Sequence, residues 1–180
     1  MELIKAITER RSIRKYTNQP VTQEDLQKII ETAKFAPSWK NSQTARYYAI
    51  LNPELKNQIA EQGTCNFSKN KLNIQNAPAL VVLTTVNGIS GAGISGFENG
   101  DFNPHWQSFD AGIACQTFCL TAYEYGLGTL IMGIFDQKKI AEILNLPEQE
   151  SISALIAIGY ADEAPVAPKR KAVDEILQII

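Results

Sequence analysis

The segment from Gln107 to Tyr125 constrains the fold most, because its pattern is helical and apolar on most sides. Its apolar residues lie around the whole cylinder rather than along one stripe: Phe109, Ile113, Cys115, Phe118, Leu120, Ala122 and Tyr123. A helix of this kind must be covered on most sides by protein. It is either a central core helix or a helix that a partner subunit covers, and the pattern alone leaves both interpretations open.

Strands and further helices are expected before and after this segment. The β-branched run at 79–86 is typical of a strand that is covered on both faces. Further strands are predicted at 47–51, 129–132 and 151–160. Further helices are predicted at 2–9, from the cap Thr22 to Pro37, at 53–62 after Asn52, and after the cap Asp136 to 144. The 180 residues suit one domain, 1–180, in which 161–180 form an extended C-terminal arm interrupted by prolines.

Charge and composition exclude several classes of protein. The net charge of −2 argues against a dedicated nucleic-acid binder, which is usually strongly basic. No apolar run reaches the length of a membrane span. Glu2 and Lys5 stand where a signal peptide would need an apolar stretch, so the expected location is cytoplasmic. Three cysteines with only Cys115 and Cys119 at helical spacing predict free thiols that pack as small apolar groups.

The usual hydrolytic, nucleotide-binding and metal-binding motifs are missing from the sequence. The chain has one histidine, no G-x-S-x-G, no phosphate-binding G-x-x-x-x-G-K-[ST] loop, and no residues at metal-ligand spacing. Residues 91–96 match G-x-G-x-x-G, but Asn87-Gly88 turns the chain before them, and that motif has meaning only between a strand and a helix. The loop 87–105 is expected to be a functional lid or a mobile segment.

Two basic clusters lie near opposite ends of this slightly acidic chain. The first holds Arg10, Arg11 and Arg14 around Ser12, and the second is Lys169-Arg170-Lys171. Guanidinium groups match the geometry of phosphate oxygens, so the clusters indicate a local anion site such as the phosphate tail of a cofactor. The alternative is that both are solvated surfaces, as basic runs usually are.

Five segments in order along the chain resemble the FMN-dependent nitroreductase family. The residues 10–16 are similar to R-R-S-x-R-x-[FY], and 36–43 to A-P-S-x-x-N-x-Q. The residues 110–114 resemble D-x-G-x-A at the start of a long central helix, and 126–128 match a G-L-G turn. Gly159-Tyr160, followed by Pro165, Pro168 and Arg170-Lys171, is similar to the closing tail of the family.

This resemblance implies an α+β fold with a central, mostly antiparallel sheet between helices. It also implies an intertwined homodimer with two FMN sites at the subunit interface. NAD(P)H would supply hydride, and a small flat acceptor such as a nitroaromatic or a quinone would receive it in a ping-pong mechanism. No catalytic side chain is implied, because the flavin itself carries the hydride.

The resemblance also implies roles for individual residues. One group would hold the flavin phosphate and ribityl chain: Arg10, Arg11, Ser12, Arg14, Arg170, and Lys169 or Lys171. A second group would lie against the flavin of the other subunit: Pro37, Ser38, Trp39 and Asn41, with Asn41 offering its amide to the ring edge. The backbone around Ile131, Met132 and Gly133 would approach flavin atoms N5 and O4.

Two departures from the family pattern lie on the expected substrate side. Trp39 stands where the family often has a smaller residue, and Thr44-Ala45-Arg46 replaces a common Gln-Pro pattern. Two alternatives to nitro or quinone reduction therefore stay open. The same fold and flavin could serve dehalogenation, flavin cleavage or desaturation, or the protein could bind flavin without catalysis.

Overall fold

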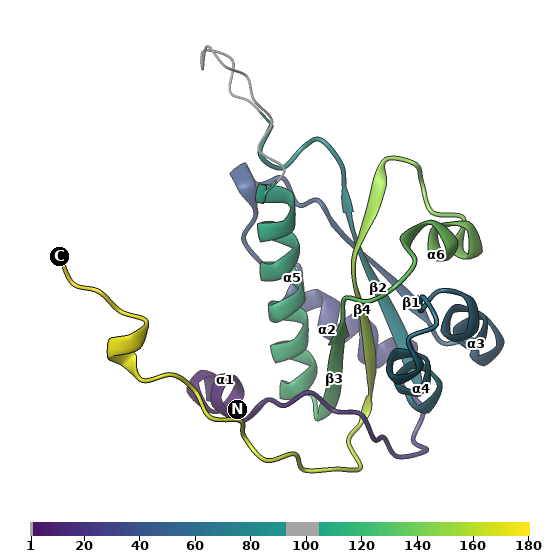
Figure 1. The fold of residues 1–180 in the computed structure, drawn as a ribbon, viewed down its shortest axis with the longest axis horizontal. Coiled ribbons are helices and arrows are strands. Elements are labelled where there is room, and N and C mark those ends of the chain that lie inside the picture. Colours follow the sequence, from purple (N-terminus) through teal and green to yellow (C-terminus); the bar gives the residue numbers. More distant parts are fainter. Residues whose placement is uncertain (1, 93–104) are drawn as a thin grey trace.

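The computed structural model describes residues 2–92 and 105–180. Its centre is a four-stranded antiparallel sheet in the order β1-β2-β4-β3 (Figure 1). The strands are β1 (Ala45–Ile50), β2 (Ala79–Val86), β3 (Leu127–Met132) and β4 (Glu150–Tyr160). The predicted strand at 79–86 is confirmed, and the other three predicted strands are present with slightly different ends.

Helices cover both faces of this sheet, so the fold has three layers (Figure 1). On one side lie α1 (Leu3–Glu9), α2 (Gln23–Ala33) and α5 (His105–Glu124). On the other side lie α3 (Pro53–Gln62), α4 (Ser68–Asn76) and α6 (Gln137–Leu144). Short 3-10 turns occur at Trp39–Asn41 and Val173–Glu175. The expected α+β architecture is confirmed.

The strand β2 is buried on both faces, as its sequence predicts. Val81 and Leu83 belong to the core beneath α2 and α5, whereas Leu80 and Val82 belong to the core beneath α3, α4 and α6. Alternate side chains of a strand point to opposite faces, so one strand contributes to both cores. These two cores hold the three layers together.

The surroundings of α5 decide in part whether it is a central core helix or a helix that a partner subunit covers. Phe118, Cys119 and Ala122 are fully buried by the chain itself, which makes α5 a core helix on that side. Gly112 and Gln116 are exposed, and Phe109 is 59% exposed. The buried Cys115 and Cys119 are free thiols, as expected, whereas Cys65 is exposed.

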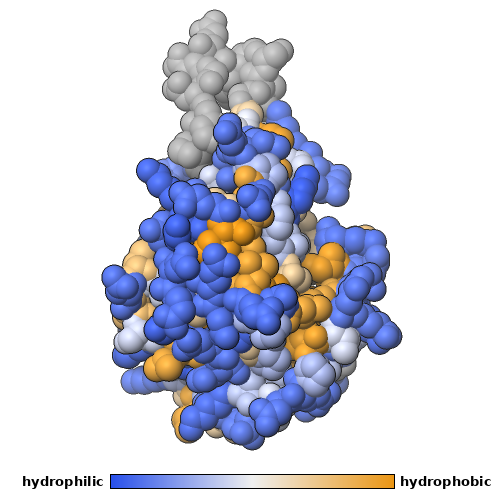
Figure 2. All heavy atoms as spheres, turned by 90° about the vertical axis from the view of Figure 1, so that its right-hand side faces the viewer, coloured by the Kyte–Doolittle hydropathy of each residue, from blue (hydrophilic) through white to orange (hydrophobic). Residues whose placement is uncertain are grey.

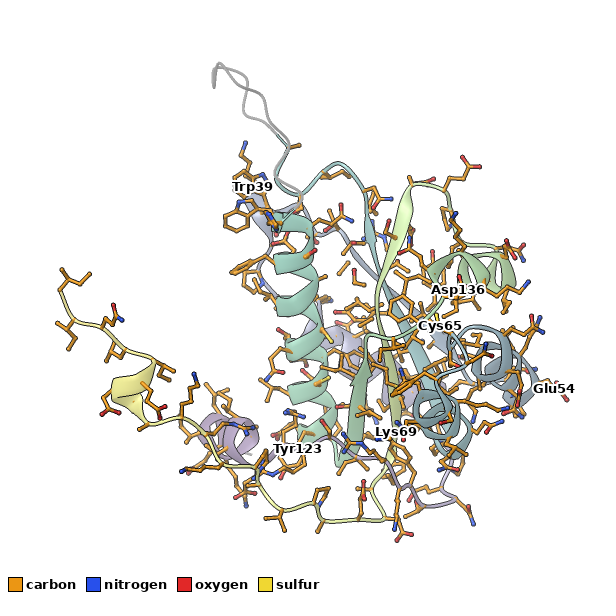
Figure 3. The ribbon with its side chains drawn as sticks, viewed as in Figure 1. Trp39, Glu54, Cys65, Lys69, Tyr123 and Asp136 are labelled. Carbon is orange, nitrogen blue, oxygen red and sulfur yellow. The ribbon has the colours of Figure 1, made fainter. Side chains whose placement is uncertain are left out.

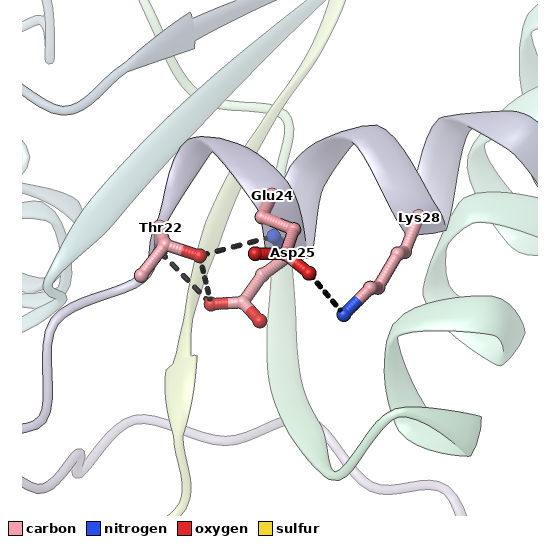
Figure 4. Close-up of polar contacts among 4 residues, drawn as sticks. All are labelled: Thr22, Glu24, Asp25 and Lys28. Carbon is pink, nitrogen blue, oxygen red and sulfur yellow. Dashed lines mark hydrogen bonds and ion pairs between the residues drawn. The ribbon is translucent and has the colours of Figure 1, made fainter.

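Three helices, α2, α3 and α6, begin after a residue whose side chain caps them. Thr22 accepts the Asp25 amide at 3.1 Å, and Asp25 accepts the Thr22 amide at 2.9 Å (Figure 4). Lys28 pairs with Glu24 at 2.7 Å one turn along the exposed side of α2. Asn52 and Asp136 cap α3 and α6 as predicted.

Two predictions about helices were wrong. The helix after Thr22 ends at Ala33 rather than running to Pro37, because the chain turns after Lys34. The helix α4 was not predicted, since its sequence is mostly polar and its first residue has no side-chain cap. It is held by Asn70, whose side-chain amide donates to the Ile134 carbonyl at 2.9 Å, and by Ile74, which is fully buried.

The chain between α1 and α2 runs along the free edge of β3. The Ile13 amide donates to the Thr129 carbonyl at 3.0 Å, and Ile13 packs closely over Gly128. The carboxylate of Glu163 accepts the amides of Arg14 and Lys15, which fixes the start of the C-terminal arm against this segment.

Beyond that point the arm extends away from the sheet and passes α1 (Figure 1). It has no helix or strand beyond the turn at Val173–Glu175. Its apolar side chains are exposed: Val166, Val173, Ile176, Leu177, Ile179 and Ile180.

The face formed by α3, α4 and α6 is mainly hydrophilic, with apolar residues visible between the helices (Figure 2). No helix in the described part of the chain combines the length and apolar character needed to cross a bilayer.

Candidate functional site

A trough of about 480 Å³ lies between α5 and the neighbouring ends of β2, β3 and β4. Its volume falls in the range of small-molecule and cofactor sites. One wall comes from α5 and the other from the sheet. The lining residues are Leu83, Thr85, Gln107, Ser108, Ala111, Gly112, Cys115, Gln116, Ile131, Ser151, Ile152, Ser153 and Ala154.

Gly112 and Gly133, near this trough, have neither the close packing nor the positive φ that accounts for other glycines in the described chain. Gly88 and Gly126 also meet open space, but their φ angles are 75° and 81°. A Cβ at Gly63, Gly128 or Gly159 would collide with a neighbouring side chain, so close packing explains those three. A Cβ at Gly112 or Gly133 would meet nothing within 4 Å. Gly112 lies inside α5, where glycine costs about 1 kcal/mol relative to alanine. Nothing in the described chain explains this cost, which is consistent with a flat molecule approaching the helix there.

Arg10 directly follows α1 and is half-buried. Its Nε atom is buried and has no hydrogen-bond partner among the described residues. Its charge acts on the thiols of Cys115, which lines the trough, and of Cys119. The pKa of Cys119 is lowered, chiefly by a hydrogen bond with Cys115 and also by Thr129 and Arg10. A buried donor without a partner is costly unless a ligand satisfies it.

The other residues of the first basic cluster are directed elsewhere within this chain. Arg11 Nη1 donates to the carbonyls of Thr8 and Arg10, at 2.7 and 2.9 Å. Arg14 is exposed, and its Nη1 donates to the Ser12 carbonyl at 3.4 Å. Ser12 is half-buried and forms a parallel bridge with Thr129. Sequence reasoning treated the three arginines alike, whereas the structure distinguishes Arg10.

The second basic cluster lies on the C-terminal arm. Lys169, Arg170 and Lys171 are exposed, and Arg170 Nη1 donates to the Pro168 carbonyl of the same arm at 3.1 Å. The arm carries this cluster past α1 and away from the trough of its own chain (Figure 1).

The end of β3 forms part of the trough wall. Ile131 is 46% exposed and lines the trough. Met132 is buried in the core beneath α3, α4 and α6, so only its backbone is available to a ligand. Gly133 is exposed.

The remaining predicted residues lie outside the trough of their own chain. Pro37, Ser38, Trp39 and Asn41 belong to the segment before β1, and none of them lines the trough. Figure 3 shows Trp39 at one end of α5 and Tyr123 at the other. The Trp39 amide donates to both carboxylate oxygens of Asp110, at 2.9 and 3.1 Å.

Sequence reasoning missed the polar side chains that line part of the trough. Gln107 Nε2 donates to Thr85 Oγ1 at 3.1 Å, and Thr85 Oγ1 lies 3.3 Å from Ser153 Oγ. These residues could bind the polar edge of a planar ligand. The available signal was the alternation of Ser151 and Ser153 with apolar residues on β4, which places both on one face.

Two sequence expectations concern residues that the structure describes only in part. The loop expected at 87–105 and the glycine pattern at 91–96 extend into 93–104, which lie outside the described residues. Across 2–92 and 105–180, no group of three or more His, Cys, Asp or Glu side chains is arranged to hold a metal ion.

Comparison with known proteins finds a matching family model, similar proteins and similar solved structures. A model of the nitroreductase family matches residues 7–160. An FMN reductase [NAD(P)H] from Bacillus subtilis is 28% identical over 93% of this chain and 70% of its own length. An iodotyrosine deiodinase from Nematostella vectensis is 25% identical over 98% of this chain and 74% of its own length. The structure of an FMN-dependent nitroreductase from Clostridium difficile superimposes with a TM-score of 0.73 at 28% identity, covering 97% of this chain and 94% of that one.

Proposed function

Because this chain belongs to the nitroreductase family, we propose that it is an FMN-dependent oxidoreductase that transfers hydride from NAD(P)H to a small, flat acceptor. The relatives described above include an FMN reductase and an FMN-dependent nitroreductase, which supports this cofactor and this donor. Bound FMN would supply the hydride chemistry, whereas the protein would bind and orient the reactants.

The observation that carries this proposal is the buried, unpartnered Nε of Arg10, whose charge acts on Cys115 in the wall of the trough. A phosphate is the ligand that best satisfies a guanidinium, because it offers several oxygens to the fork of donors. Ser12 adds a hydroxyl next to Arg10 along the edge of β3. The trough would then hold the ring against Gly112, with Ile131 on the opposite wall.

The chain's own residues would orient the flavin ring in two ways. The backbone at Ile131, Met132 and Gly133 would approach N5 and O4, since this strand end borders the trough. Thr85, Gln107 and Ser153 would offer hydrogen bonds to the polar edge of the ring. No side-chain acid or base is needed in either arrangement.

A second copy of the chain would complete each site. Pro37, Ser38, Trp39 and Asn41 do not reach the trough of their own chain, so we infer that they lie against the flavin of the partner. The exposed apolar residues of the C-terminal arm would be covered in the same dimer. The arm would bring Lys169, Arg170 and Lys171 toward a phosphate, and Arg11 and Arg14 would add positive charge there.

Donor and acceptor would use one exposed face of the flavin in turn, because the sequence has no separate nicotinamide motif. Steady-state plots at several acceptor concentrations would then be parallel, as in ping-pong turnover. Intersecting lines would contradict the shared site.

The experiment that tests the cofactor assignment is the titration of FMN into apoprotein variants, followed by flavin fluorescence. Arg10→Ala should weaken FMN binding by about 10- to 150-fold, the equivalent of one charge-assisted hydrogen bond. Lys28→Ala is the matched control, because Lys28 pairs with Glu24 on the exposed side of α2 (Figure 4). Equal affinities of the two variants would reject the phosphate site at Arg10.

A second function is favoured by one comparison. The similarity to an iodotyrosine deiodinase supports reductive dehalogenation on the same flavin. Rapid bleaching by NAD(P)H and reoxidation by a nitro or quinone acceptor would favour the oxidoreductase. Bleaching by dithionite alone would favour dehalogenation or flavin binding without catalysis.

A further inference from the structure

The chain contains two tryptophans, and both lie in one aromatic cluster at the start of α5. The rings of Trp39 and Trp106 have centroids 4.7 Å apart, and those of Trp106 and Phe109 lie 5.2 Å apart. Phe109 is 59% exposed, and both tryptophans are half-buried. The cluster therefore offers a partly open aromatic surface, and Trp39 is the member that belongs to the segment before β1.

A positive charge lies next to this surface. Lys40 Nζ is 5.8 Å from the centroid of the Trp39 ring. Arg46, the second residue of β1, donates to the carbonyls of Gln43 and Ala45, at 2.8 and 2.9 Å. Within 2–92 and 105–180, the ion pairs include no carboxylate that neutralises Lys40 or Arg46. The nearby Asp110 is buried and already accepts the Trp39 amide and the Ser90 hydroxyl.

The backbone holds this charged aromatic surface in an unusual conformation. Lys40, Asn41 and Gln43 have φ angles of 46°, 55° and 49°. Such left-handed backbone is unfavourable for residues with a side chain, and it persists only where surrounding contacts impose it. Here Asp110 accepts the Trp39 amide, and Ser38 Oγ accepts the Gln43 amide at 2.9 Å. The segment is thus a preorganised surface rather than a flexible loop.

We propose that Trp39 and Lys40 determine acceptor specificity, and that they select flat aromatic compounds that carry a negative charge. Trp39 would stack on the aromatic ring, and Lys40 would pair with a carboxylate or similar group attached to it. This inference rests on the proposed function, in which the segment faces the flavin of the partner subunit.

The test compares two acceptors of the same shape that differ in charge, 4-nitrobenzoate and 4-nitrobenzamide. Both tryptophans lie in the cluster, so quenching of intrinsic tryptophan emission in the purified protein reports binding there. The wild-type protein should bind 4-nitrobenzoate about three- to fivefold more tightly, the size expected for a partly exposed charge pair. Equal affinities for the two compounds would overturn the proposal.

Matched variants separate the contribution of charge to acceptor binding from the contribution of ring stacking. Lys40→Gln should remove the preference for the anion, whereas Lys69→Gln, on α4 and far from Trp39 in Figure 3, should keep it. Trp39→Leu should weaken the binding of both compounds and leave their ratio nearly unchanged. A preference that survives Lys40→Gln would also contradict the assignment.

Turnover distinguishes a failure of this inference from a failure of the proposed function. With NAD(P)H as donor, the ratio of kcat/KM values for the two acceptors should follow the ratio of their affinities. A protein without FMN or turnover would reject the proposed function, while the emission titration would still decide the binding preference. Turnover with equal kcat/KM values would reject only the role of Lys40.

Discussion

The carboxylate of Asp110 accepts the backbone amide of Trp39 with both of its oxygens, across 71 positions of the sequence. The same carboxylate accepts the hydroxyl of Ser90 at 2.6 Å. One buried side chain in the first part of α5 therefore fixes the segment before β1 and the start of the loop that follows β2. Asp110 positions Trp39 although it is not expected to touch the flavin.

The first prediction concerns Asp110 itself. Asp110→Ala should lower the free energy of unfolding by about 1–3 kcal/mol, because the Trp39 amide and the Ser90 hydroxyl lose their buried acceptor. Asp110→Asn keeps one acceptor oxygen and should lose less. Urea unfolding followed by circular dichroism measures the stability, and a shift of tryptophan emission to longer wavelength reports the loosened segment. An Asp110→Ala protein with wild-type stability and emission would contradict this role.

The sequence predicts the fold well wherever local signals are strong. The cap Thr22 and the near-continuous β-branched run at 79–86 are explained by local hydrogen bonding and by burial on two faces. The helix α4 could not be predicted, because its stability comes from tertiary contacts of Asn70 and Ile74 rather than from its own amphipathicity. The end of α2 was placed too late, since the proline used as a signal comes after the turn.

The candidate site is predictable in composition but not in arrangement. The motifs identify Arg10, Arg11 and Arg14 together, yet only tertiary packing buries the Nε of Arg10 without a partner while Arg11 bonds to nearby carbonyls. Likewise, the sequence does not show that Trp39 is held by Asp110, because the two residues meet only after α5 packs against the segment before β1.

The second prediction uses Gly112. Gly112→Ala should stabilise the apoprotein by about 0.5–1 kcal/mol, because alanine favours a helix and its methyl group meets open space. The same methyl group should weaken FMN binding, by roughly 5- to 150-fold if the ring packs against the helix. Thermal unfolding without flavin and FMN titration measure the two effects.

Gly128→Ala is the matched control for this change. Its Cβ would lie 2.5 Å from Cγ1 of Ile13, so the substitution should destabilise the apoprotein by about 1–3 kcal/mol. If Gly112→Ala leaves FMN affinity unchanged, the ring does not lie against α5.

The third prediction is a pH dependence at the start of α2. Burial raises the pKa of Asp25, but hydrogen bonds from Thr22 and the charge of Lys28 outweigh it and hold the pKa below its ordinary value (Figure 4). A carboxylate whose pKa is lower in the folded state stabilises the fold above its unfolded pKa, near 3.9. That stability is lost as the pH falls through the folded pKa.

Denaturant unfolding of Asp25→Asn at pH 6 and pH 3 tests this sign. The variant should be less stable than the wild type at pH 6, and the difference should shrink at pH 3. Glu148→Gln, an exposed substitution elsewhere, should show no such convergence. A constant difference between Asp25→Asn and wild type at both pH values would exclude the linkage.

The last prediction tests whether each site is built from two chains. Arg10→Ala and Asn41→Asp should each weaken FMN binding when present in both subunits, since Arg10 would bind the phosphate and Asn41 the ring edge. Asparagine and aspartate both tolerate left-handed backbone, so the φ of 55° at Asn41 should survive the change. In a dimer with one Arg10→Ala subunit and one Asn41→Asp subunit, one site carries both substitutions and the other carries neither. Such dimers, obtained by coexpression with two affinity tags, should therefore bind one FMN per dimer with wild-type affinity. If Arg10 and Asn41 of the same chain served one flavin, both sites would be impaired and no high-affinity site would return.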